Sequence, residues 1–391
     1  MKVCIIYDRF YEYDGSKVTI GGIQSYISSL SKVIADVEMD VVIYQRSTKP
    51  FQVYHNKTKV IGVCAKLGEL PDFKYLAQQA KDYERLVFSD LIIWATEDIS
   101  CRVNYCKTLS IQHGISFDVH RPDSKLPKLF RKLLNVDITP YYQLLRYSKA
   151  IKYIKNSNYI VCVDYNYPNW YRTILPNKLI DYHVIPNFTK IKPKSEIENK
   201  VKSWDDKEKV IKILFARRFF DIRGVSLMIE LTEKLINKYG GKIDITYAGE
   251  GPRLQDVVLL SQKYKNIKIT LYDAVNSIDF HSQFDVALIP SIGSEGTSLS
   301  LLEAMGAGCY CLSSQVGGLT NIVLDGFNGR LLRTRVDDWF LALTELIETE
   351  DHSDVKRQII NGHNVVKESF SLERWENMWK IVLNKIVSDD T

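Results

Sequence analysis

Residues 285–332 read DVALIPSIGSEGTSLSLLEAMGAGCYCLSSQVGGLTNIVLDGFNGRLL, and this stretch carries most of the fold signal. An apolar run over 286–289 predicts a strand that ends at Pro290. A turn rich in serine and glycine follows, and a helix is predicted to begin near 298–300. The next apolar run, 310–312, predicts another strand. Buried strands that alternate with helices are typical of parallel sheets covered on both faces.

The same alternation extends over the whole chain. The predicted strands cover 3–7, 41–44, 60–63, 91–94, 109–111, 160–163, 182–185, 211–215, 243–248, 267–271, 286–289, 310–312 and 329–332. A segment rich in Lys, Glu and Asp separates the two halves, and the 391 residues suit two domains. We therefore predict an α/β protein with an N-terminal domain over 1–187, a linker over 188–209 and a second domain over 210–371. A final helix over 372–391 carries an aromatic stripe that suits packing.

Composition and charge exclude several classes of protein. Apolar residues make up 45% and charged residues 25%, as in ordinary globular domains, which argues against disorder, collagen or coiled coil. The net charge of +5 is too small to indicate nucleic-acid binding. Seven cysteines match no zinc or disulfide framework, and no apolar run reaches the length of a signal peptide or a membrane span. We expect a cytoplasmic protein.

The basic excess is local. Residues 121–155 hold nine basic and two acidic residues, a charge of +7, which leaves −2 for the rest of the chain. Within it, 126–133 has an apolar helical face flanked by basic side chains, namely Lys125, Lys128, Arg131 and Lys132. Such a helix suits an anionic membrane surface or an acceptor held there, but it also suits a solvated helix packed on its own domain.

Two glutamates follow the strand at 286–289. Glu295 lies in the turn, and Glu303 lies eight residues further, on the predicted helix. The carboxyl ends of parallel strands are where α/β folds bind ligands, and free N–H groups at a helix start suit a phosphate. A carboxylate can accept two hydroxyls, so Glu303 suits the diol of a ribose. A surface or capping glutamate is the alternative.

Three further motifs follow strands. In KILFARRFFDIRG, residues 212–224, arginines at a strand end suit a diphosphate, although a solvated basic loop would look the same. Gly21 and Gly22 open the first helix and permit close approach to a phosphate. They lack the G-x-G-x-x-G spacing of nicotinamide-dependent enzymes. His113 follows the strand at 109–111, where a structural role is the alternative. Asp-x-Asp is absent, so we expect no metal and no other cofactor.

Taken in this order, the motifs resemble the retaining glycosyltransferases of the GT-B fold, family GT4. Glu295 and Glu303 resemble that family's E-x7-E pair, and 301–308 its following helix. Arg218 and Arg223-Gly224 resemble its phosphate motif. Four other motifs also match the family pattern, namely the Gly-Gly loop, the His-Gly after a strand, Pro186-Asn187 and residues 249–252. The resemblance implies two Rossmann-like domains whose parallel sheets face across a cleft, with the last helix crossing back to the first domain.

The resemblance also implies roles for the residues. Arg218, Arg223, Gly21 and Gly22 would hold the donor diphosphate, and Glu303 would bind the ribose. Glu295 and His113 would act at the donor sugar and the acceptor. The backbone of the helix start would hold the sugar and phosphate, through Gly296, Thr297, Ser298, Leu299 and Ser300. The implied partners are a UDP- or GDP-sugar and a glycan or lipid-linked glycan used for a cell-surface polysaccharide.

The chain departs from the family pattern at several positions. Arg217 replaces a glycine, Arg223 replaces a lysine, and Thr320-Asn321 replaces a common Pro-Glu. Asp273 stands where a glycine is common. Two alternatives remain at this stage, namely a sugar-nucleotide epimerase of the same fold and a catalytically silent subunit that binds a partner.

Overall fold

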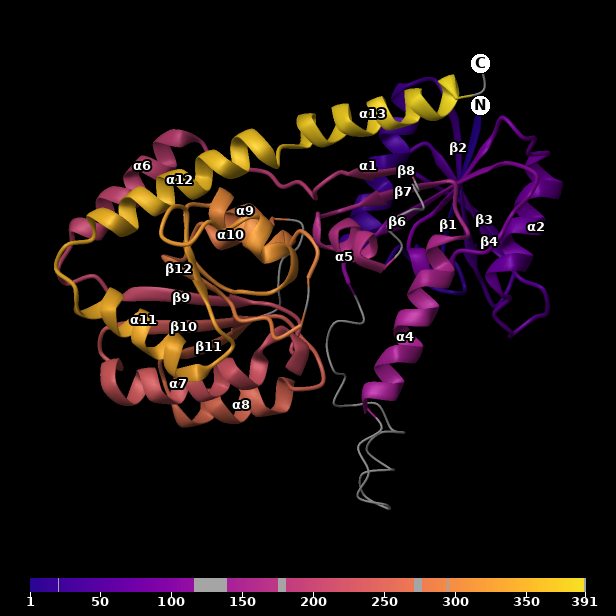
Figure 1. Cartoon of the computed structure of the whole chain (residues 1–391). Coiled ribbons are helices and arrows are strands. Elements are labelled where there is room, and N and C mark those ends of the chain that lie inside the picture. Colours follow the sequence, from indigo (N-terminus) through magenta and orange to yellow (C-terminus); the bar gives the residue numbers. More distant parts are fainter. Residues whose placement is uncertain (20, 116–138, 175–180, 271–275, 294, 390–391) are drawn as a thin grey trace. The chain divides into compact units, whose positions relative to one another are not determined.

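The structure is a computed structural model that describes residues 1–19, 21–115, 139–174, 181–270, 276–293 and 295–389 (Figure 1). The chain divides into two compact units. The N-terminal unit comprises Met1–His113, His120–Ile185 and Trp375–Thr391, and the C-terminal unit comprises Gly114–Val119 and Pro186–Arg374. Each unit is an α/β sandwich, as the alternation of apolar runs predicts.

In the described part of the chain, the N-terminal unit has an eight-stranded sheet in the order β3-β4-β2-β1-β5-β6-β7-β8. Its strands are β1 (Lys2–Tyr7), β2 (Asp40–Arg46), β3 (Phe51–His55), β4 (Thr58–Val63), β5 (Leu91–Trp94), β6 (Lys107–Gln112), β7 (Tyr159–Cys162) and β8 (Asp181–Val184). Neighbouring strands pair in parallel except β3 with β4. The sequence predicted all of them but β3. That strand lies at the sheet edge and alternates half-buried with exposed residues, so it shows no continuous apolar run.

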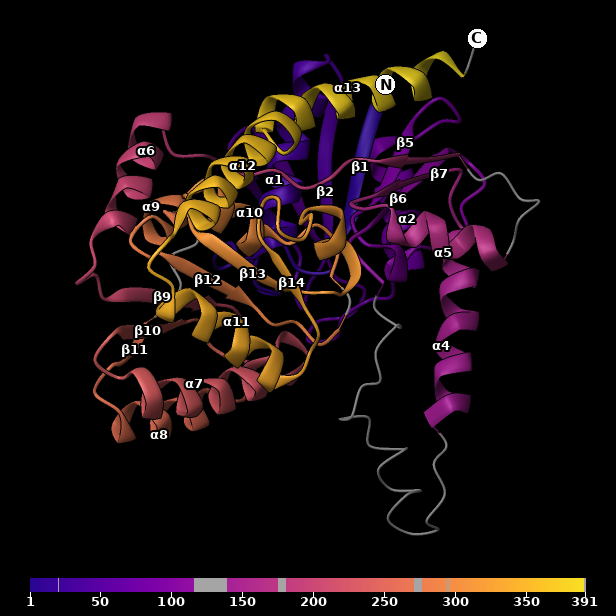
Figure 2. The ribbon, with the colours of Figure 1, turned by 60° about the vertical axis from the view of Figure 1, so that its left-hand side comes forward.

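Helices flank this sheet. They are α1 (Gly22–Asp36), α2 (Phe73–Glu84), α4 (Thr139–Ile154), α5 (Asn166–Ile174) and most of α13 (Leu372–Ser388), together with the short η1 (Glu97–Ile99). The start of α4 lies farthest from the strands in both views (Figures 1 and 2). Trp375 and Trp379 of α13 contact the ring of Tyr26 on α1 edge-on, and the Trp379 indole donates to the Tyr26 hydroxyl at 3.0 Å. The aromatic stripe of the last helix therefore packs against the N-terminal unit.

The described C-terminal unit has a six-stranded parallel sheet in the order β11-β10-β9-β12-β13-β14. The strands are β9 (Ile211–Ala216), β10 (Ile243–Ala248), β11 (Ile267–Thr270), β12 (Val286–Ile289), β13 (Tyr310–Ser314) and β14 (Arg330–Leu332). The helices are α6 (Lys194–Lys202), α7 (Val225–Tyr239), α8 (Leu254–Lys263), α9 (Ser277–His281), α10 (Leu299–Gly306), α11 (Val336–Glu348) and α12 (Ser353–Ser369), with short turns η2 (Ser203–Asp205), η3 (Asp221–Arg223) and η4 (Gly317–Asn321).

Both faces of this sheet are buried. On β9, Ile213 and Phe215 join the core beneath α7, α8 and α11, whereas Leu214 and Ala216 join the core beneath α10. Figure 2 shows α7 and α8 on one side of the strands and α9 and α10 on the other. Since successive strand residues point to opposite faces, two buried faces require a continuous apolar run. This requirement is why the C-terminal strands could be predicted so closely.

Candidate functional site

The site is built where two neighbouring strands of the C-terminal unit end. Strands β9 and β12 are adjacent and parallel, so their carboxyl ends meet at one edge of the sheet. After β9 the chain passes through η3 to Gly224, which has φ 82 and directly precedes α7. After β12 it passes through Ser291 and Glu295 into α10. The two loops contact each other through backbone hydrogen bonds from Ile292 and Gly293 to the Ile222 carbonyl.

Glu295 is the centre of a buried ion-pair cluster. Its residue is 8% exposed, and its Oε1 pairs with the guanidinium groups of Arg217 and Arg223, the latter at 2.8 Å. The Ser291 hydroxyl donates to the same oxygen. Burial raises the pKa of Glu295, but Arg217, Arg223 and Ser291 oppose it and hold the pKa at about 2. The carboxylate is therefore ionised throughout the neutral range.

Arg217 links both loops to the first turn of α10. Its Nη1 donates to Ser300 Oγ at 2.9 Å and to Ser298 Oγ at 3.2 Å, and its Nη2 donates to Ser291 Oγ at 3.0 Å. Burial lowers the pKa of Arg217, while the attraction of Glu295 opposes this shift. The Ser298 hydroxyl accepts from Arg217 and makes no capping hydrogen bond to the helix that it precedes.

Arg218 has a different environment from Arg217. Its residue is exposed, its guanidinium lies 5.7 Å from the centre of the Phe220 ring, and it forms no ion pair with a carboxylate of the described residues. Partial burial lowers the pKa of Arg218, and the nearby Arg223 lowers it further. Arg218 thus presents a cation beside a second cation, which is an arrangement that an anion would stabilise.

The backbone before α10 is held in place from outside the loop. The Asn187 side chain donates to the Thr297 carbonyl at 2.8 Å, and the Gly318 N–H donates to the Glu295 carbonyl at 2.6 Å. Thr297 is buried, whereas Glu303, in the second turn of α10, is half-buried. These contacts fix the entry into α10 close to the ion-pair cluster.

His113 lies in the N-terminal unit, directly after β6. Its Nε2 lies 2.9 Å from the Ala95 carbonyl, which can only accept, so Nε2 carries the proton. Burial lowers the pKa of His113 to about 4, although this hydrogen bond and Asp98 oppose the shift. The imidazole is therefore neutral near pH 7. Its ring contacts Tyr26 edge-on, with 5.1 Å between the ring centres.

Within the C-terminal unit, the structure thus brings part of the predicted site together. Glu295, Arg223 and the 296–300 segment form one cluster, with Arg218 and Glu303 beside it in the C-terminal unit. The N-terminal unit contains the other predicted residues, His113, Gly21 and Gly22, of which Gly22 is the first residue of α1. Four predicted membrane or acceptor residues lie outside the described residues: Lys125, Lys128, Arg131 and Lys132.

Sequence reasoning missed Arg217 and Ser291. Arg217 counted only as a departure from a glycine pattern, yet it is among the most buried charged residues of the site. The available signal was an arginine directly after the apolar run 213–216, where a charged side chain needs a partner. Ser291 had no signal beyond its place after Pro290.

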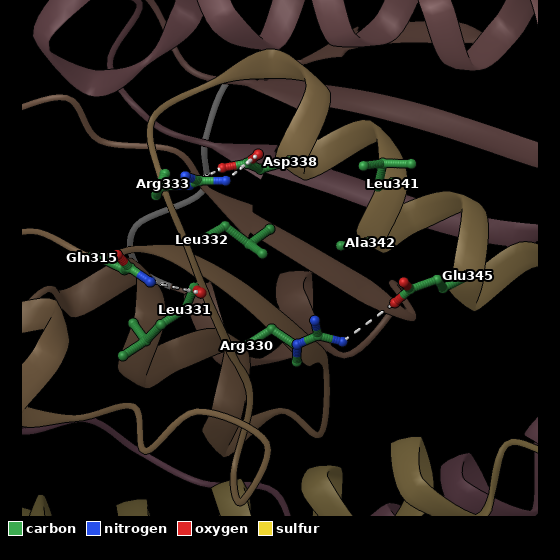
Figure 3. A pocket seen from close by; sticks show the side chains of 9 residues that line it. All are labelled: Gln315, Arg330, Leu331, Leu332, Arg333, Asp338, Leu341, Ala342 and Glu345. Atoms are coloured by element: carbon green, nitrogen blue, oxygen red, sulfur yellow. Dashed lines mark hydrogen bonds and ion pairs between the residues drawn. The ribbon is translucent and has the colours of Figure 1, made fainter.

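A separate pocket lies between β14 and α11 (Figure 3). It has a volume of about 280 Å³, and its arginines already face carboxylates. Arg333 pairs with Asp338 at 2.7 Å, and Arg330 lies 3.7 Å from Glu345. The paired charges give this pocket no excess charge to attract an ion. Elsewhere in the described ranges, no group of three His, Cys, Asp or Glu side chains is arranged to hold a metal ion.

Comparison with known proteins finds a family match over part of the chain. Residues 196–364 match the family described as Glycosyl transferases group 1. An uncharacterized glycosyltransferase of Methanocaldococcus jannaschii is 24% identical over 400 residues, which cover 94% of this chain and 96% of that protein. An Escherichia coli protein, UDP-Gal:alpha-D-GlcNAc-diphosphoundecaprenol alpha-1,3-galactosyltransferase, is 30% identical over 129 residues, or 30% of this chain and 33% of that protein.

Solved structures share the fold. Sucrose-phosphate synthase from Thermosynechococcus elongatus aligns with a TM-score of 0.73 and 15% identity over 99% of both chains. HepE of Anabaena in complex with UDP aligns with a TM-score of 0.68 and 12% identity, over 98% of this chain and 100% of that one. The predicted α/β fold of GT-B type, with two parallel-sheet domains, is confirmed. The segment that matches the group 1 glycosyl transferases contains Arg217, Arg223, Glu295 and Glu303.

Proposed function

We propose that this protein is a retaining glycosyltransferase that moves a sugar from a nucleotide-sugar donor to a glycan or lipid-linked glycan acceptor. The observation that carries the proposal is the cluster of Arg217, Arg223 and Glu295 at the carboxyl edge of β9 and β12, next to the first turn of α10. This cluster lies within the segment that matches the group 1 glycosyltransferases. Anions bind readily at such an edge, because arginines and helix N–H groups converge there.

In this proposal the donor lies along the edge. Arg218 and Arg223 hold the two phosphates, and the backbone of residues 296–300 donates to a phosphate and the sugar. Glu303 accepts the two ribose hydroxyls, since a half-buried carboxylate offers two oxygens to a diol. Gly21 and Gly22 are proposed to contact the diphosphate as well. Complexes of similar structures with UDP and with UDP-glucose support a UDP-sugar as donor, and a GDP-sugar fits the same phosphate contacts.

The proposed chemistry needs no side-chain nucleophile. The acceptor hydroxyl attacks the anomeric carbon from the face that the diphosphate leaves, and the departing phosphate oxygen accepts the hydroxyl proton, so the configuration is retained. Arg218 and Arg223 stabilise the charge that develops on the leaving group. In this proposal the ionised Glu295 orients sugar hydroxyls, and the neutral His113 contacts the sugar or the acceptor. Two guanidinium groups supply the charge that a metal ion would otherwise provide, so we propose metal-independent transfer.

The acceptor proposal rests on α4 and on one relative. Tyr141, Leu144 and Leu145 of α4 are exposed, and the helix carries basic but no acidic residues. Such a surface suits a peripheral contact with an anionic membrane. The E. coli relative acts on a sugar linked to diphosphoundecaprenol, as its name states. We therefore propose a lipid-linked acceptor at the cytosolic membrane face, used to build a cell-surface polysaccharide. No helix within the described residues has the length and apolar character to span a bilayer.

Thermal-shift screening against sugar nucleotides and free nucleotides tests the donor proposal. A donor at about 100 times its Kd stabilises the protein by about 2.7 kcal/mol. For a domain of this size we expect a rise in the melting temperature of roughly 5–10 °C. The same nucleotide sugar should support transfer in the presence of EDTA, with the anomeric configuration retained in the product. If no sugar nucleotide raises the melting temperature or is consumed, the protein is a silent subunit instead.

A matched pair of variants tests the assignment of the site. Glu295→Gln should abolish most of the transfer activity, whereas Glu350→Gln, at an exposed residue, should retain it. An epimerised nucleotide sugar that appears without any acceptor would identify an epimerase and refute the proposed transfer.

A further inference from the structure

Arg217 has the contacts of a structural element rather than those of a ligand-binding cation. Its side chain is 6% exposed, compared with 26% for Arg223, and it contacts Glu295 and three serines. Those partners belong to the loop after β12 and to the first turn of α10, while Arg217 itself follows β9. A phosphate could bind this guanidinium only by displacing groups that hold the two loops together.

The charges of the cluster lead to the same conclusion. Three guanidinium groups lie near one carboxylate, namely those of Arg217, Arg218 and Arg223 near Glu295. The net charge of these four groups is therefore +2. A nucleoside diphosphate sugar carries about two negative charges on its phosphates, so the site is matched to the donor only if Glu295 neutralises one arginine. Because Arg217 is the most buried of the three arginines, it is the one that stays paired with Glu295.

Arg223 is shared between two roles. It contacts Glu295 at 2.8 Å in the structure, and it is also the second of the two arginines proposed to hold the diphosphate. A carboxylate that depended on Arg223 alone would compete with the phosphate for it. Because Arg217 and Ser291 also bind the Glu295 carboxylate, it can lose its ion pair with Arg223 and keep its position.

We propose that Arg217 is a positioning residue, which holds Glu295 in place so that Arg223 can exchange the carboxylate for a donor phosphate. This inference rests on the proposed function and assigns a role to a residue that departs from the family pattern. No bond is made or broken in the exchange. Arg217 acts on the donor only through Glu295.

Steady-state kinetics of a charge series tests the proposal, with the sugar nucleotide identified by the screen as donor. Arg217→Met lowers the net charge of the cluster to about +1, and we expect the donor KM to rise ~10-fold and kcat to fall ~100-fold as Glu295 loses its position. Adding Glu295→Gln restores about +2. The double variant should regain a donor KM within ~3-fold of wild type while kcat stays low. Arg217→Lys should keep most of the donor affinity, because it keeps the charge.

The pH profile separates positioning from simple loss of structure. The charged groups that act on Glu295 among the described residues are Arg217, Arg218 and Arg223. With Arg217 present, kcat should show no limb from Glu295 above about pH 4, because the pKa of Glu295 is held at about 2. In Arg217→Met, the effect of burial on the pKa of Glu295 is opposed by fewer cations, so this pKa rises. The acidic limb of the kcat profile should then appear one or more pH units higher than in wild type. A loss of structure would lower the amount of active enzyme without moving this limb.

The controls make each failure distinct. Arg333→Met removes an exposed ion pair of the same type, with Asp338, and should leave KM, kcat and the pH profile as in wild type. If the wild-type protein neither binds nor transfers any sugar nucleotide, the proposed function is wrong. The role assigned to Arg217 is wrong under a different result. In that case wild type is active, Arg217→Met and the double variant have the same donor KM, and their pH profiles are the same as that of wild type. If Arg217→Met does not fold, the double variant and Arg217→Lys decide the question.

Discussion

Replacing Gly224 with alanine should destabilise the C-terminal unit far more than an ordinary glycine substitution. Gly224 has φ 82 and ψ 18 between η3 and α7, and a Cβ there would lie 1.9 Å from the Pro290 carbonyl oxygen. The left-handed conformation alone costs about 1 kcal/mol for alanine. Since such a contact normally exceeds 3.0 Å, the backbone must move by about 1 Å, which adds about 2 kcal/mol of overpacking strain.

Gly326 provides the matched control for this variant. It lies in the same unit with φ 71, and no atom lies within 4 Å of the Cβ that alanine would add. Thermal unfolding followed by calorimetry should show a fall of roughly 6–12 °C for Gly224→Ala but only about 2–4 °C for Gly326→Ala. Because Pro290 begins the loop that carries Glu295, Gly224→Ala should also raise the donor KM. Equal melting temperatures for the two variants would refute the steric reasoning.

Two further predictions concern the N-terminal unit. Burial, followed by repulsion from Asp98, raises the pKa of Glu97 to about 8 from 4.5, so its contribution to stability is present below pH 4.5 and is lost as the pH rises to 8. In urea unfolding at pH 9, the Glu97→Gln variant should therefore be more stable than wild type by about 2 kcal/mol. At pH 5 the two proteins should have similar stability. An equal difference at both pH values would contradict the raised pKa of Glu97. Trp379→Phe removes the donor to the Tyr26 hydroxyl and should lower the free energy of unfolding by about 1 kcal/mol. The control Ile381→Ala changes an exposed residue of α13 and should lower it by less than half as much. Similar losses for the two variants would show that the hydrogen bond does not contribute to stability.

The buried elements were predictable because their apolar residues follow the period of the element. Strand β12 is covered on both faces and is a continuous apolar run, whereas β9 and β10 are mostly apolar, with one charged residue each near the strand start. Helix α1 buries apolar residues that recur at helical spacing, among them Tyr26, Leu30 and Ile34. Strand β3 was missed because an edge strand with two of its five residues exposed and none fully buried has a pattern close to that of a loop.

The candidate site was predictable in its components but not in its pairing. The sequence pattern placed Arg223 and Glu295 in loops that follow predicted strands, and both residues lie in the segment that matches the group 1 glycosyl transferases. The pairing depends on which strands are neighbours. Residues 217 and 295 are far apart in the chain, and only the adjacency of β9 and β12 brings them together.

The sequence by itself determined the fold class, the strand ends and the side chains available there, because burial of both sheet faces imposes a periodic apolar pattern that can be read locally. Only the tertiary structure decided which arginine keeps the carboxylate. Charge alone makes Arg217, Arg218 and Arg223 equivalent, but the packing buries Arg217 against Glu295 and three serines and leaves Arg218 exposed. Desolvation demands a partner for the buried cation and none for the exposed one, and burial is a property of the folded chain.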